Sequence, residues 1–121
     1  MPKTILVVED NVLDMKLFCD LLGAHGYATL QARDGRSVAG LVRDWRPDLI
    51  LMDIQLPDMS GLEAMRPLKA DTELRQIPIV AVTAYAMRGD EERVRAAGCE
   101  GYIAKPIPIA GLIATVREHV G

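Results

Sequence analysis

Four consecutive apolar residues, 49–52 (Leu-Ile-Leu-Met), constrain the fold of this chain more than any other stretch. An unbroken apolar run of this length is typical of a strand that is buried on both faces of a sheet. The run ends at Asp53, and a turn-rich segment, residues 54–61, follows it. The sequence therefore predicts a carboxylate at the C-terminal end of a central strand, the edge at which open α/β sheets bind ligands.

The other apolar segments alternate with segments of helical periodicity. The sequence predicts strands at residues 5–8, 27–32, 49–53, 77–82 and 101–104, and helices at 11–25, 34–45, from 60 on, at 90–97 and from 107 on. Such alternation is typical of parallel βαβ units with helices on both faces of the sheet. We therefore expect a single α/β domain over residues 1–121, with no output domain.

Two expectations for the helices depend on particular side chains. Pro67 falls about two turns into the helix that begins near Ser60, where proline removes a backbone donor, so we expect a kink or an early end there. The predicted core stripe of the first helix consists of Leu17, Phe18, Leu21 and Leu22. That stripe leaves Met15 and Cys19 outside it, either as a docking patch for a kinase helix bundle or as ordinary scattered apolar residues.

The net charge of −3 at pH 7 gives this chain no general electrostatic attraction for nucleic acid or for an anionic membrane. Cys19 and Cys99 lie far apart and in no metal-ligand spacing, which favours reduced thiols in a cytosolic protein. The sequence shows no signal peptide and no apolar run of membrane length. We therefore expect a cytoplasmic protein with no nucleic-acid partner and no membrane insertion.

Polar residues follow four of the five predicted strands. They are Glu9 and Asp10 after the first strand, Asp53 after the third, Thr83 after the fourth and Lys105 after the fifth. In a parallel sheet these ends share one edge, so three carboxylates, a hydroxyl and an ammonium group would meet there. Clustered carboxylates repel one another, and a hard divalent cation such as Mg²⁺ relieves that repulsion. The pattern predicts phosphoryl transfer with Asp53 as the nucleophile.

Each of these signals is weak when it is taken alone. Glu9 and Asp10 could simply cap the first helix, Thr83 could be an ordinary strand-end residue, and Lys105 could be a solvated charge. Their joint placement at the ends of strands one, three, four and five is specific, and it favours a functional site over chance.

With these motifs the chain resembles the receiver domain of two-component response regulators over essentially its whole length. The motifs are residues 7–11, 51–57, 60–61, 81–84 and 105–106. The resemblance implies a flavodoxin-like fold, in which a five-stranded parallel sheet of order 2-1-3-4-5 forms the middle layer of a three-layer sandwich.

The resemblance also implies a phosphoacceptor and a metal site. Asp53 would accept a phosphoryl group from a histidine kinase or a histidine phosphotransfer protein. Asp10, Asp53 and the backbone carbonyl of Gln55 would bind Mg²⁺ directly, and Glu9 would act through a water. Mn²⁺ is the alternative ion.

The resemblance further implies a switch. Lys105 and Thr83 would hold the phosphoryl group, and the Lys105-Pro106 peptide bond would be cis. Thr83 would move toward the phosphoryl group and Tyr102 would turn inward behind it. The surface of the fourth helix, fifth strand and fifth helix would then change and bind the regulated kinases. Without this resemblance, the favoured interpretation of Tyr102 is a half-buried strand residue with its hydroxyl group in water.

Several stretches outside the core resemble a narrower group, the single-domain regulators of cell division and polarity in alphaproteobacteria. They are residues 15–18, 26–27, 86–93 and 98–100. This resemblance implies that the protein signals by binding other proteins, and that its partners are histidine kinases, which could recruit it to a cell pole.

Three alternatives stay open at this point. The first is a Mg²⁺-dependent phosphatase with an aspartyl nucleophile. Such enzymes have an Asp-x-Asp motif, but here Gln55 stands where the second Asp of the motif would be. The second is a flavin-binding module of the same fold, which the low aromatic content disfavours. The third is a receiver domain taken from a larger regulator.

Overall fold

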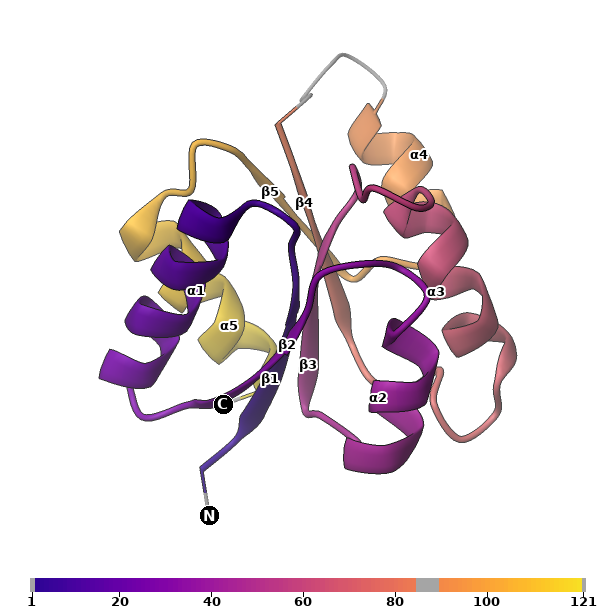
Figure 1. The fold of residues 1–121 in the computed structure, drawn as a ribbon, viewed down its shortest axis with the longest axis horizontal. Coiled ribbons are helices and arrows are strands. Elements are labelled where there is room, and N and C mark those ends of the chain that lie inside the picture. The colour runs from indigo at the N-terminus through magenta and orange to yellow at the C-terminus, as the bar shows by residue number, and fades with distance from the viewer. Residues whose placement is uncertain (1, 85–89, 121) are drawn as a thin grey trace.

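The computed structural model describes residues 2–84 and 90–120 and contains a five-stranded parallel sheet (Figure 1). The strand order is β2-β1-β3-β4-β5, which confirms the predicted fold class. The strands are β1 (Thr4–Val8), β2 (Ala28–Ala32), β3 (Leu49–Asp53), β4 (Ile79–Thr83) and β5 (Gly101–Ala104). The helices are α1 (Val12–Ala24), α2 (Val38–Trp45), α3 (Gly61–Ala70), α4 (Asp90–Ala96) and α5 (Ile109–Val120).

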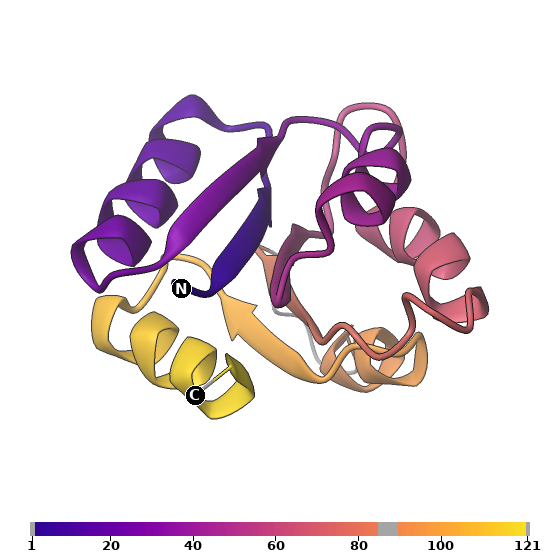
Figure 2. The ribbon, with the colours of Figure 1, turned by 90° about the horizontal axis from the view of Figure 1, so that it is seen from below.

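Helices cover both faces of this sheet. Figure 2 shows α1 and α5 on one side and α2, α3 and α4 on the other. Successive strand side chains point to opposite faces, so one strand contributes to two cores. In β1, Ile5 and Val7 belong to the core under α1 and α5, whereas Leu6 and Val8 belong to the core under α2, α3 and α4. The same holds for β3, which lies in the middle of the sheet with helices over both faces. Its side chains must be apolar on both faces, which explains the unbroken apolar run at residues 49–52.

The two ends of α1 have local causes in the sequence. At the N-terminus the Asn11 side chain accepts a hydrogen bond from the Asp14 backbone N–H at 3.0 Å. At the C-terminus Gly26 adopts a φ of +87°, a left-handed conformation that glycine reaches at little cost. The Tyr27 N–H then donates to the Leu22 carbonyl at 3.0 Å and turns the chain toward β2. Local hydrogen bonds and the conformation of Gly26 thus determine where α1 begins and ends.

The predicted early end of the third helix at Pro67 is wrong. The helix α3 continues through Pro67 to Ala70. Pro67 and Glu63 are both exposed, so water can reach the Glu63 carbonyl that loses its helical donor. Solvation of that carbonyl lowers the cost of an internal proline, while the predicted kink stays a prediction.

Other boundaries differ from the prediction by a few residues. The helix α2 begins at Val38, four residues after Asp34, because Asp34 Oδ1 instead accepts a hydrogen bond from the Ser37 N–H at 3.0 Å in the turn that precedes the helix. The strand β4 begins at Ile79, after Pro78, which has no N–H to give to the sheet. Residues 85–89, between β4 and α4, lie outside the described residues, so the part of the 86–93 resemblance that falls on them has no structural description. Within residues 2–84 and 90–120, no helix has the length and apolar character needed to cross a membrane.

Candidate functional site

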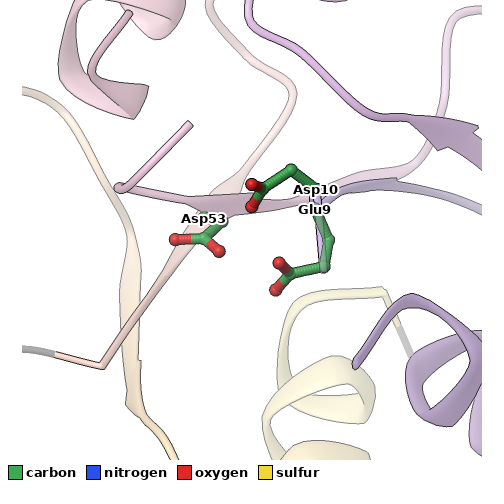
Figure 3. A group of neighbouring side chains, drawn as sticks. All are labelled: Glu9, Asp10 and Asp53. Carbon is green, nitrogen blue, oxygen red and sulfur yellow. The ribbon is translucent and has the colours of Figure 1, made fainter. Parts of the chain in front are cut away.

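The carboxyl ends of β1 and β3 bring three carboxylates together. Parallel pairing aligns Val8 with Met52, so the residues that follow them, Glu9 and Asp53, meet at the edge of the sheet. One oxygen from each of Glu9, Asp10 and Asp53 lies within 4.8 Å of the others. Figure 3 shows the three carboxylates turned toward a common space, with Glu9 and Asp53 buried and Asp10 exposed. The three acids that the sequence placed at strand ends therefore form one cluster.

The loop after β3 folds back closely against Asp53. The Gln55 N–H donates a hydrogen bond to Asp53 Oδ1 at 2.8 Å, which orients this carboxylate. The Gly61 N–H donates to the Ile54 carbonyl at 2.8 Å, and a Cβ added at Gly61 would lie 2.9 Å from the Ile54 Cα. A side chain at position 61 would push this loop away, so glycine is needed for the close approach.

Lys105 lies in the middle of the acidic groups. Its Nζ is 2.7 Å from Glu9 Oε1, 2.9 Å from Asp14 Oδ2 and 3.1 Å from Asp53 Oδ2, and its side chain is only 15% exposed. The order of strand ends in the sequence predicted that Lys105 and Asp53 lie close together, whereas the proximity of Asp14 was not predicted. A weak signal existed, because Asp14 lies in the first turn of α1 directly after the acidic pair. The peptide bond that follows Lys105, to Pro106, is cis.

Burial and contacts with neighbouring groups shift the pKa values of two groups in this site. Burial raises the pKa of the Glu9 carboxyl from 4.5 to about 7, and the nearby Asp53 adds to the rise, although Lys105 and the Asn11 N–H oppose it. Burial lowers the pKa of the Lys105 ammonium group, but contacts with Glu9, Asp14 and Asp53 outweigh that effect and hold the pKa above its usual range. Lys105 is therefore charged, and the site has more negative charge than this one ammonium group neutralises.

Thr83 ends β4 beside the acidic cluster and is buried. The Gln55 side-chain amide donates a hydrogen bond to Thr83 Oγ1 at 3.0 Å. Gln55, expected to contribute only its backbone carbonyl, thus also links the ends of β3 and β4 through its side chain. Tyr102 lies on β5 and is half-buried. Tyr102 is thus on the element that the expected switch requires.

The donor set of this cluster fits a hard divalent cation. Carboxylate oxygens are the ligands that Mg²⁺ prefers, and Glu9, Asp10 and Asp53 provide them at the carboxyl edge of the sheet. The Glu9 Oε1 atom is buried and makes no well-aligned hydrogen bond, although it lies near the Lys105 ammonium group. A cation at this place would compensate that oxygen and the charge excess around it.

The expectation that Met15 lies outside the core stripe of α1 is wrong. Met15 is 3% exposed and packs in the core with Phe18 and Leu22. Cys19 is half-buried, and its Sγ lies 3.9 Å from the Met15 Sδ. The exposed large apolar residues of α1 are instead Val12 and Leu13, at 61% and 77% exposure, in the turn of the helix nearest to the carboxylate cluster.

Comparisons with known proteins agree with this geometry. Residues 5–117 match the model of the response regulator receiver domain family. The polar-differentiation response regulator DivK of Brucella anthropi is 57% identical over 121 residues, which cover all of this chain and 98% of that protein. DivK of Brucella ovis is 55% identical over the same length and share of each chain.

Two solved structures resemble the chain over at least 98% of its length. The receiver domain of a sensor histidine kinase from Pseudomonas aeruginosa PAO1, crystallised with a magnesium ion coordinated in its active site cleft, has a TM-score of 0.92 and 35% identity. The match covers 100% of this chain and 99% of that one. The BeF3-activated receiver domain of Klebsiella pneumoniae RstA has a TM-score of 0.90 and 30% identity, with 98% of each chain covered.

Proposed function

This chain belongs to the response regulator receiver domain family, and from that premise we propose that Asp53 accepts a phosphoryl group from a phosphohistidine. The donor is a histidine kinase or a histidine phosphotransfer protein. The observation that carries the proposal is the position of Asp53, next to the Lys105 ammonium group and within a group of clustered carboxylates. Lys105 Nζ lies 3.1 Å from Asp53 Oδ2, and Asp53 belongs to a carboxylate cluster that fits a divalent cation.

In the proposed transfer, an Asp53 oxygen attacks the phosphorus in line with the phosphorus–nitrogen bond of the donor. An oxygen–phosphorus bond forms as the phosphorus–nitrogen bond breaks, and the leaving imidazole nitrogen keeps the electron pair and takes up a proton. Water later hydrolyses the acyl phosphate and restores the carboxylate. Asp53 is buried, which keeps its carboxylate poorly solvated, and the hydrogen bond from the Gln55 N–H orients it.

The cation site consists of Glu9, Asp10, Asp53 and the Gln55 backbone carbonyl, with Mg²⁺ as the ion and Mn²⁺ as the alternative. A bound divalent cation supplies charge neutralisation at the phosphoryl oxygens. The carboxylate cluster supports this assignment, as does the magnesium ion coordinated in the active site cleft of the Pseudomonas aeruginosa receiver domain.

Lys105 and Thr83 hold the phosphoryl group in this proposal. Lys105 already contacts Asp53, whereas Thr83 contacts the Gln55 amide and would turn its hydroxyl group toward the phosphoryl oxygens. Tyr102 would follow inward and change the surface formed by α4, β5 and α5. This coupling would convert a reaction at the sheet edge into a change of binding surface.

We also propose that this surface binds histidine kinases that control cell division and polarity, in the cytoplasm or at a cell pole. The support is the 57% identity to a protein described as a polar-differentiation response regulator.

The phosphodonor would dock on the exposed Val12 and Leu13 of α1, since these apolar side chains lie next to the cluster that includes Asp53.

Transfer of radiolabelled phosphoryl groups from a phosphorylated histidine kinase tests the phosphoacceptor. The wild type should be labelled in the presence of Mg²⁺, and Asp53→Asn should not. Asp58→Asn is the matched control, because Asp58 lies in the loop after β3 but contacts the backbone N–H groups of Gly35 and Arg36 instead of the cluster. Equal labelling of Asp53→Asn and the wild type would refute the proposal.

A second variant separates docking from chemistry. Leu13→Asp should slow transfer from the kinase at least tenfold and leave labelling by acetyl phosphate unchanged, because Leu13 is 77% exposed and outside the acidic cluster. Equal slowing with both donors would place the effect in the site itself and would contradict the docking role.

The phosphatase alternative has its own test. Sustained turnover of p-nitrophenyl phosphate by the wild type, lost in Asp53→Asn, would support an enzyme with an aspartyl nucleophile. A single round of labelling without such turnover favours the signalling role.

A further inference from the structure

Asp14 is an additional carboxylate in the site and lies outside the proposed cation cluster. It belongs to α1, whereas its partner Lys105 follows β5, so the two lie 91 positions apart in the sequence. Asp14 Oδ2 lies 2.9 Å from Lys105 Nζ. The Asp14 side chain is 32% exposed, and its backbone N–H is held by the Asn11 side chain at 3.0 Å. Asp14 is therefore fixed on a rigid helix start with its carboxylate aimed at Lys105.

The other two partners of Lys105 have a conflicting role. Glu9 and Asp53 contact the ammonium group, and both also belong to the cluster that fits a divalent cation. An ammonium group and a divalent cation that approach the same oxygens compete for them and repel each other. Among the three carboxylates that contact Lys105, Asp14 alone takes no part in that cluster.

We propose that Asp14 is a positioning residue for Lys105, a role that rests on the proposed phosphoacceptor function. Asp14 holds the ammonium group when a divalent cation takes over the oxygens of Glu9 and Asp53. It also screens the positive charge of Lys105 from that cation. Lys105 thereby stays beside Asp53, ready for the phosphoryl group, and does not compete with the cation for its ligands.

A purely structural role for Asp14 makes different predictions. An acidic side chain in the first helical turn stabilises a helix through its dipole, and loss of this effect changes stability alone. A positioning role affects the binding of the cation. Removal of the Asp14 charge deletes a nearby negative charge and exposes the ammonium charge of Lys105, and both changes weaken the binding of a divalent cation.

Mg²⁺ titration by NMR or calorimetry measures this effect on the folded protein. The dissociation constant should rise about three- to tenfold in Asp14→Asn, equivalent to about 0.7–1.4 kcal/mol. Asp14→Glu should recover most of the affinity, because a longer carboxylate can still reach Lys105. Asp20→Asn is the control, since Asp20 is on the same helix but pairs with the exposed Lys16.

The ammonium group of Lys105 provides a second signal that a helix-dipole effect would not change. In the wild type its ¹⁵N-attached protons should stay protected from exchange after Mg²⁺ is added, because Asp14 retains them. In Asp14→Asn they should exchange rapidly once Mg²⁺ binds. Equal Mg²⁺ affinity of Asp14→Asn and the wild type, no Mg²⁺ binding by the wild type, or unchanged protection in the variant would each overturn the proposal.

These measurements need no phosphoryl donor. If acetyl phosphate fails to label Asp53 in the wild type, the phosphoacceptor function fails, while the titration and the exchange data still report directly on Asp14 and Lys105. If Asp53 is labelled and the variant binds Mg²⁺ normally, only the role of Asp14 is wrong.

Discussion

Two lysines of this protein are buried to a similar degree but have very different surroundings. The side chain of Lys69, on α3, is 17% exposed, and that of Lys105, after β5, is 15% exposed. Lys69 Nζ contacts a single carboxylate, Glu100, at 2.5 Å and the Arg75 carbonyl at 3.2 Å. Lys105 contacts three carboxylates, and Asp10 lies beside two of them.

The difference separates an ion pair that holds the fold together from one that belongs to a site. The second oxygen of Glu100 accepts the Ile79 N–H at 2.6 Å, so Lys69 and Glu100 satisfy each other and tie α3 to the starts of β4 and β5. Around Lys105 the acids outnumber the base, and the unfolded chain would separate them. Such an excess of charge is retained where a ligand relieves it, as we propose for a cation and a phosphoryl group.

The largest expected effect is a pH dependence of stability that arises in the Lys105 site. Glu9 has a folded pKa of about 7 against an ordinary 4.5, so between these values the folded protein keeps a proton that the unfolded chain has lost. In the metal-free protein, the free energy of unfolding should therefore fall by about 3 kcal/mol as the pH rises from 4.5 to 7. Above that pH, this contribution should stay level. Urea denaturation in EDTA measures it, and Glu9→Gln should remove the dependence. If the difference in the free energy of unfolding between the wild type and Glu9→Gln did not change with pH, the raised pKa of Glu9 would be contradicted.

The next effect compares removal of each lysine. Lys69→Met leaves Glu100 without its cation and the Arg75 carbonyl without its donor, so we expect a loss of about 2 kcal/mol in the free energy of unfolding. Lys105→Met should cost a similar amount at neutral pH without a cation. Added Mg²⁺ should reduce the difference in the free energy of unfolding between Lys105→Met and the wild type, because the cation replaces the lost charge. The corresponding difference for Lys69→Met should stay unchanged. If Mg²⁺ reduced both differences equally, the distinction between the two lysines would fail.

A smaller effect has the opposite sign. Asp53→Asn removes one of the crowded charges but keeps an oxygen that can accept the Gln55 N–H. Lys105 keeps Glu9 and Asp14 as partners. We expect the metal-free variant to gain about 1 kcal/mol at neutral pH, since functional sites commonly reduce stability. Thermal denaturation in EDTA checks the gain, with Glu100→Gln as a control that should lose stability, and a loss in Asp53→Asn would show that its charge supports the fold.

Sequence patterns predicted the strand ends because those signals are local. Residues 49–52 are apolar because β3 is buried on both faces, and Asp53 follows where the strand leaves the core. Parallel pairing then brings Glu9 next to Asp53, and no knowledge of the helices is needed. The acidic cluster could therefore be predicted before its geometry was known.

Contacts between distant elements could not be predicted in this way. The pairing of Asp14 with Lys105 depends on where α1 lies relative to the end of β5, which no local pattern encodes. The error at Met15 has a related cause. Apolar residues lie on more than one side of α1, so the sequence alone allows more than one choice of buried face. Packing against the sheet selects the face with Met15, Phe18 and Leu22.

The smallest expected effect concerns an ion pair in which both side chains are exposed. Arg46 and Glu73 are 51% and 73% exposed, and Arg46 Nη2 lies 2.8 Å from Glu73 Oε2. Because water screens both charges, Glu73→Gln should change the free energy of unfolding by no more than about 0.5 kcal/mol. Denaturation at low and high salt measures the change, which should shrink further as salt rises. The distance in this pair is close to that between Lys69 and Glu100, so a loss above about 1 kcal/mol would mean that proximity, and not burial together with the balance of charges, sets what these pairs contribute.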